Sequence, residues 1–87
     1  MKLIGQFCIR KVLGEIVAVP IDESLQHFSG IVSLNEVGKF LMEKLETEQT
    51  PESLVAAVTE EYDVDKATAE KDVADFLGIL KENELIR

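Results

Sequence analysis

The stretch FSGIVSLNEVG, residues 28–38, passes from a β-type segment into a helix start with no loop between them. Ser33 and Glu36 have the S-x-x-E spacing of a capping box, in which the serine hydroxyl accepts from the Glu36 amide and the carboxylate reaches back. A strand over residues 28–33 is therefore expected to lead directly into a helix. The fold must therefore place this strand and this helix next to each other without a connecting loop.

Two further β-type runs come before this stretch, QFCIRKVL at residues 6–13 and EIVAVP at residues 15–20. Gly14 separates them, which predicts a hairpin with its turn at Gly14 and Glu15. Pro20 ends the second run, because proline cannot donate a ladder hydrogen bond. Three strands are therefore expected before any helix.

Three helices are predicted after the strands. The first extends to about Glu46, and the second begins where Thr50 and Pro51 have the pattern of an N-cap followed by proline at the first helical position. Asp65 repeats the start signal, so the third is expected from about Lys66 to Asn83. The residues expected on the inward faces of the three helices are Val37, Phe40, Leu41, Leu45, Leu54, Val58, Tyr62, Ala69, Val73, Phe76, Leu77 and Leu80.

This order of elements predicts the fold class. Short strands cannot bury their apolar side alone, so the helices must pack against one face of the sheet. The expected fold is α+β and winged-helix-like, with a three-stranded antiparallel sheet followed by a three-helix bundle in the order β-β-β-α-α-α. The 87 residues support one modest core and contain no repeat or linker, so residues 1–87 are expected to form a single domain.

The charge of the chain disfavours two classes of partner. Seventeen acidic residues against nine basic ones give a net charge of −8, which repels nucleic-acid phosphates and anionic membrane surfaces. No apolar run approaches the roughly 18 residues that span a bilayer, and the N-terminus lacks the pattern of a signal peptide. A cytoplasmic protein is expected, and the single cysteine, Cys8, fits a reducing compartment.

No catalytic or metal-binding pattern stands out. The single histidine, His27, lies 19 positions from the single cysteine, Cys8, whereas zinc usually needs three or four nitrogen or sulfur donors. The many carboxylates fall mostly on the polar sides of the helices, and the glycines form no phosphate-binding loop. We therefore expect no catalytic residues, no metal, no cofactor and no enzymatic activity.

Residues 29–33 carry no charge and no proline. Natural edge strands are usually blunted by such residues, and residues 6–13 do carry Arg10 and Lys11. If the first two strands form the hairpin, residues 29–33 form the other edge, and an extended peptide could add to it by β-augmentation. The alternatives are that the domain itself covers this edge or that a second copy of the chain pairs with it.

The predicted third helix supplies a candidate second wall. On a helical wheel Ile79 lies near Asp72 and Asp75, with Phe76 between them and the core. These residues would form an apolar shoulder with an acidic rim beside the third strand. The alternative is that Ile79 only widens the face that packs on the core.

The order of elements and the run SLNEVGKFLMEKLE, followed by TPESLVAAVTEEYDVDKATAEKDVADFLGILKENELI, resemble the PqqD family from end to end. The residues that carry the resemblance are Ser33, Leu34, Asn35, Glu36, Gly38, Tyr62, Val64, Asp72, Val73, Phe76, Leu77, Leu80, Leu85 and Ile86. The resemblance implies a recognition element for ribosomally made, post-translationally modified peptides, as in pyrroloquinoline quinone, lasso-peptide and sactipeptide pathways.

The resemblance also implies a mechanism and a site. Such a domain is a noncatalytic peptide chaperone that holds the leader of the precursor between the third strand and the third helix. It presents the precursor to a modifying enzyme such as a radical-SAM protein, or to a leader peptidase. The residues predicted to bind the peptide are Ser29, Gly30, Ile31, Val32 and Ser33 on the strand and Asp72, Asp75, Phe76 and Ile79 on the helix.

Two other functions share the expected fold. A winged-helix DNA-binding regulator needs a basic recognition face, but residues 51–62 contain no lysine or arginine. A homodimerisation module would use the open edge for self-pairing and bind no peptide.

Overall fold

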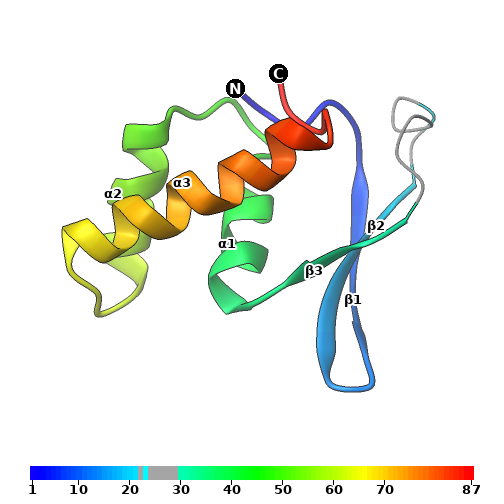
Figure 1. The fold of residues 1–87 in the computed structure, drawn as a ribbon, viewed down its shortest axis with the longest axis horizontal. Helices are drawn as coiled ribbons and strands as arrows, with labels where there is room; N and C mark the ends of the chain where they lie inside the picture. The colour runs from blue at the N-terminus through cyan, green and yellow to red at the C-terminus, as the bar shows by residue number, and fades with distance from the viewer. Residues whose placement is uncertain (22, 24–29) are drawn as a thin grey trace.

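The structure is a computed structural model that describes residues 1–21, 23 and 30–87. Three strands precede three helices, which confirms the predicted element order and fold class (Figure 1). The elements are β1 (Phe7–Val12), β2 (Glu15–Pro20), β3 (Val32–Leu34), α1 (Glu36–Lys44), α2 (Pro51–Glu61) and α3 (Lys66–Glu82).

The β1-β2 hairpin has a two-residue turn. The strands form one antiparallel sheet in the order β1-β2-β3, and Val12 already pairs with Glu15. The turn residues are therefore Leu13 and Gly14, whose φ angles are 51° and 84°. The predicted turn at Gly14 and Glu15 is wrong by one residue, because Glu15 belongs to the ladder. Positive φ at both central residues matches the right-handed twist of a hairpin.

Strand β3 is shorter than predicted. Among the described residues only Val32–Leu34 pair with β2. The strand expected over residues 28–33 is therefore wrong at Gly30 and Ile31, which do not pair, and at Leu34, which does; residues 28 and 29 lie outside the described residues. Continuing the register, in which Ala18 faces Val32, would place Gly30 opposite Pro20, which has no N–H to donate. Gly30 also has a φ of 146°, outside the range of strands.

Helix α1 is capped by Asn35, not by Ser33. The Asn35 Oδ1 accepts a hydrogen bond of 2.7 Å from the amide of Gly38. Ser33 pairs with Val17 in the sheet, so it is still part of the strand and cannot also begin the helix. The predicted capping box of Ser33 and Glu36 is therefore wrong. The helix ends at Lys44, slightly before the predicted end.

The predicted cap, Ser33, and the observed cap, Asn35, lead to different expectations for stability. Asn35→Ala is expected to lower the free energy of unfolding by about 0.5–2 kcal/mol, because it removes the acceptor for the Gly38 amide. Ser33→Ala should change it by less than about 0.5 kcal/mol, because the Ser33 side chain is exposed. Urea unfolding of the two variants checks this. A larger loss of unfolding free energy for Ser33→Ala than for Asn35→Ala would show that Ser33 caps the helix.

The starts of α2 and α3 agree with the sequence prediction. Thr50 Oγ1 accepts from the Ser53 amide at 3.0 Å, and Pro51 occupies the first turn of α2. Asp65 caps α3 by accepting from the Thr68 amide at 2.7 Å, a hydrogen bond that lowers the pKa of the Asp65 carboxyl. These caps fix where each helix begins, and therefore which side of α3 faces the core.

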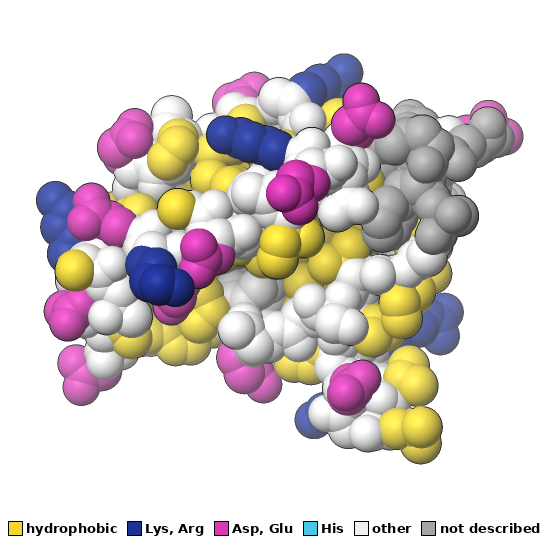
Figure 2. Space-filling view, in the orientation of Figure 1, with side chains coloured by type: hydrophobic (Ala, Val, Ile, Leu, Met, Phe, Trp, Pro, Cys, Tyr) yellow, Lys and Arg dark blue, Asp and Glu magenta, His cyan; other side chains and the backbone are white. Residues whose placement is uncertain are grey.

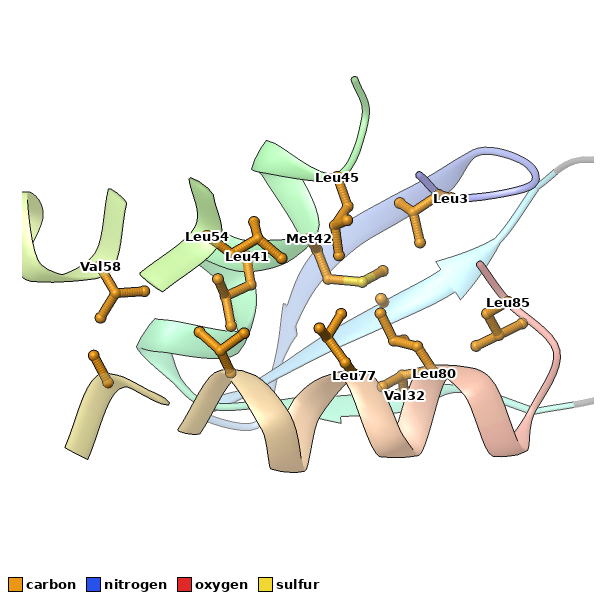
Figure 3. Packing of buried hydrophobic residues seen from close by; sticks show 13 residues of the cluster. Leu3, Val32, Leu41, Met42, Leu45, Leu54, Val58, Leu77, Leu80 and Leu85 are labelled. Carbon is orange, nitrogen blue, oxygen red and sulfur yellow. The ribbon is translucent and has the colours of Figure 1, made fainter. Parts of the chain in front are cut away.

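The core lies where the three helices meet one face of the sheet (Figure 3). Most of the predicted inward residues are buried; four, namely Val37, Phe40, Tyr62 and Phe76, are only partly buried and pack against the core. The buried residues of the core are Leu3, Ala18, Val32, Leu41, Met42, Leu45, Leu54, Val58, Ala69, Val73, Leu77, Leu80 and Leu85. The sequence prediction missed Met42, which follows Leu41 on α1.

The N-terminal segment closes the core beside the end of α3. The backbones of Lys2 and Arg87 exchange hydrogen bonds of 2.9 and 3.0 Å, and the Ile4 amide donates to the Leu85 carbonyl at 3.0 Å. This pairing, which no sequence pattern predicted, buries Leu3. Across the described ranges, no helix has the length and apolar character needed to cross a membrane.

Candidate functional site

A groove of about 220 Å³ lies between β3 and α3 and is closed at its base by α1. Figure 2 shows hydrophobic side chains exposed between α3 and β3, with acidic side chains along the α3 side. The lining residues are Ser33, Leu34, Asn35, Val37, Gly38, Leu41, Asp72, Asp75, Phe76 and Ile79.

One side of the groove is the outer strand of the sheet. β3 pairs with β2, and the described residues place no strand on its other side. In an antiparallel ladder alternate residues point their N–H and C=O groups away from the partner strand. Part of the β3 backbone therefore faces outward, next to the exposed side chain of Ser33.

The other side of the groove is a flank of α3. Residues 72, 75, 76 and 79 share this flank because side chains three and four apart lie on one side of a helix. Burial of Leu77 and Leu80 sets the rotation of α3, so Asp75 and Ile79 turn outward. Ile79 is 47% exposed, whereas Phe76 is half-buried against the core. The apolar surface of the groove is thus held in place by the core packing of its neighbours.

The base of the groove is formed by the start of α1, which the site prediction missed. Val37 and Leu41 face it, and their i, i+4 spacing directly after the strand was the available signal. A Cβ at Gly38 would lie 3.4 Å from the Phe76 ring and 3.3 Å from Asn35 Oδ1. The missing side chain therefore allows Phe76 and the helix cap to pack closely against this turn.

The rim of the groove is acidic. Asp72 is half-buried, and Asp75 lies further out, where its carboxylate forms an exposed salt bridge of 2.8 Å with Lys71 Nζ. The hydrogen bond and the charge of Asp75 raise the pKa of the Lys71 ammonium. An exposed pair of this kind stabilises the fold little. The two aspartates mainly give the mouth of the groove a negative character.

The structure brings five of the nine predicted peptide-binding residues together in this groove. They are Ser33, Asp72, Asp75, Phe76 and Ile79.

Three of the remaining predicted residues do not line the groove. The Val32 side chain is buried in the core, so only its backbone belongs to the strand edge. Gly30 and Ile31 are exposed and lie just before β3, and Ser29 lies outside the described residues.

Of the larger hollows among the described residues, one of about 560 Å³ reaches Ser33 and Leu34 of β3 from the hairpin turn but no residue of α3, and two others include no residue of β3. One of about 830 Å³ lies between α2 and α3, and one of about 600 Å³ lies beside the N-terminal segment. Strand addition depends on unpaired backbone groups rather than on volume. The smaller groove is therefore the better candidate for an extended ligand.

A family model described as "Coenzyme PQQ synthesis protein D (PqqD)" matches residues 15–86 of the chain. The chain belongs to the PqqD family. The match spans the sheet from the start of β2 through all three helices, including both walls of the groove. The expected family membership is confirmed.

Two solved structures share the fold of this PqqD-family chain. One, described as "TbiB1 in Complex with the TbiA(beta) Leader Peptide", is 32% identical with a TM-score of 0.73 and covers 100% of this chain and 95% of its own. The other, "Lasso peptide synthetase B1 complexed with the leader peptide", is 24% identical with a TM-score of 0.66, covering 97% and 93%. A comparison with curated proteins found no match.

The sequence predicted no metal site. Within residues 1–21, 23 and 30–87, no group of three or more His, Cys, Asp and Glu side chains is arranged to hold a metal ion. His27 lies outside the described residues, and Cys8 is a half-buried residue of β1.

Proposed function

We propose that this PqqD-family domain binds the leader segment of a ribosomally made precursor peptide and presents the precursor to the enzyme that modifies or cleaves it. The observation that carries this proposal is the shared groove, in which the open edge of β3 faces the Asp72, Phe76 and Ile79 flank of α3. The 32%-identical TbiB1, whose described complex contains a leader peptide, supports it.

The leader would bind as an additional strand. Hydrogen bonds from its main chain to the backbone of β3 would supply affinity that does not depend on the leader's sequence. Every second leader side chain would then point toward α3, because side chains alternate along a strand. Those side chains would meet Phe76 and Ile79, so we expect apolar residues at alternate positions of the bound segment.

The acidic rim adds a second element of selection. A leader residue with a negative charge near Asp72 and Asp75 would be repelled, whereas a lysine or arginine would be attracted. The net charge of −8 acts in the same direction over longer distances. We therefore expect the bound segment to carry no acidic residue where it crosses α3.

The domain would act without chemistry of its own. Holding the leader raises the effective concentration of the precursor near the enzyme, which makes modest affinity sufficient. A radical-SAM protein or a leader peptidase is the class of enzyme that we propose as the partner, and no cofactor is needed for this role.

Titration of the isotope-labelled domain with the leader peptide of its precursor, monitored by NMR, tests the site. Shifts are expected to be largest in β3, at Gly30 and Ile31 before it, and on the Asp72 to Ile79 flank of α3. The backbone of Val32 and Ser33 should shift, because strand addition changes its hydrogen bonding. Shifts confined to the α2 side of the molecule would overturn the proposed groove.

A further inference from the structure

Val12 and Leu13 at the end of the β1-β2 hairpin form an apolar knob that does not pack against the core. Leu13 is 100% exposed and Val12 is 49% exposed. The hairpin extends away from the helices in Figure 1, and Figure 2 shows hydrophobic side chains gathered at that end of the molecule. A single exposed apolar side chain is ordinary on a protein surface, so exposure alone is weak evidence.

The backbone of the turn supplies an independent observation. Leu13 has a φ of 51° and Gly14 a φ of 84°, the positive values of a type I′ turn. Asn, Asp and Gly are preferred at the first of these positions because they tolerate a left-handed backbone, whereas leucine does not. Leu13 therefore costs stability in its backbone and recovers none by burial.

The charges around the knob differ from those of the whole chain. Arg10 and Lys11 are exposed beside it, although the chain carries only nine basic residues against seventeen acidic ones. Glu15, which faces Val12 across the strands, is acidic and offsets part of this positive charge. An apolar knob with two basic neighbours complements an apolar pocket with an acidic rim.

The position of the knob relates it to the groove. A shallow hollow connects Gly14 and Glu15 at the turn with Ser33 and Asn35 at the groove. A protein that held the hairpin end would therefore stand next to a peptide on the outer edge of β3. This arrangement brings a bound precursor and a docked protein to the same end of the sheet.

We propose that the hairpin end, formed by Arg10, Lys11, Val12 and Leu13, docks into an apolar, acid-rimmed pocket on the enzyme that acts on the bound precursor. This inference rests on the proposed function. Burial of one leucine within a small contact area fits a transient partner that releases the domain after each precursor. A second copy of the chain also offers an apolar groove with an acidic rim, but it is the poorer occupant because two molecules of net charge −8 repel each other.

The test replaces Leu13 with the residue that the turn prefers. Leu13→Asn creates an Asn-Gly turn, so the melting temperature should stay the same or rise. Its affinity for the purified enzyme that modifies or cleaves its precursor should fall about tenfold or more, because the buried leucine is lost. Leader affinity, measured separately by fluorescence anisotropy, should stay unchanged. Lys11→Glu should slow association and reduce its dependence on salt.

The matched control is Ile21→Asn, which removes another exposed apolar side chain, 62% accessible and outside the hairpin end. It should leave enzyme affinity unchanged. Three results would each overturn the docking proposal. Leu13→Asn could bind the enzyme with wild-type affinity, Ile21→Asn could lose as much enzyme affinity as Leu13→Asn, or Leu13→Asn could lose only self-association in a sedimentation experiment. If the enzyme binds through Leu13 but the leader does not bind at all, docking stands and the proposed function fails.

Discussion

Replacing Ile79 with aspartate is expected to weaken leader binding by about tenfold to a hundredfold. The change removes the exposed apolar side chain of the α3 wall and adds a third carboxylate to a rim that already holds Asp72 and Asp75. The leader would lose apolar burial and face a hydrophilic wall. Fluorescence anisotropy with a labelled leader peptide measures the change directly.

The matched control for this variant is Ala74→Asp. Ala74 is exposed on α3 and lines the hollow toward α2, so the substitution adds the same charge to the same helix outside the groove. Leader affinity should change by less than about twofold, since exposed charges interact weakly at physiological salt. If both variants lost affinity equally, the effect would come from net charge and the groove assignment would fail. Circular dichroism checks that both keep the fold.

Replacing Leu80 with alanine is expected to reduce the free energy of unfolding by about 2–5 kcal/mol. Leu80 is completely buried and belongs to the cluster that contains Val32 of β3 (Figure 3). Truncation leaves a cavity where α3 packs against the sheet. Since a small domain has only about 5–15 kcal/mol of stability, this is a large share of the total.

Urea unfolding measures this loss, and Ile79→Ala provides the comparison on the adjacent residue. Because Ile79 is 47% exposed, its truncation should cost less than about 1 kcal/mol while still weakening leader binding. The pair separates the two roles of α3, stability on one flank and binding on the other. A greater loss of stability for Ile79→Ala than for Leu80→Ala would contradict the assignment of these flanks.

Where a signal was local, the sequence predicted the element well. Thr50 with Pro51, and Asp65 before Lys66, marked the starts of α2 and α3 because a cap needs only a side-chain oxygen and a backbone amide three residues away. The α3 flank that carries Ile79 followed from helical periodicity alone. These features depend on neighbours along the chain, so no tertiary information was needed.

Where strand pairing overrode a local signal, the sequence prediction was wrong. Ser33 and Asn35 are both good cap residues, and the spacing to Glu36 favoured Ser33. Pairing of Ser33 with Val17 holds Ser33 in the strand and leaves the cap to Asn35. The length of β3 has a similar origin, because Pro20 on the neighbouring strand limits how far the ladder can extend.

By itself, the sequence determined the order of elements, the uncharged third strand and the acidic apolar flank of α3, since composition and periodicity are properties of the chain alone. Only the tertiary structure decided that β3 is the outer strand, that it shares a groove with that flank, and that Val37 and Leu41 form its base. It also decided that residues 2–4 pair with 85–87. Contacts between segments that are distant in the sequence depend on the packing of the whole core, so the pattern within each segment does not predict them.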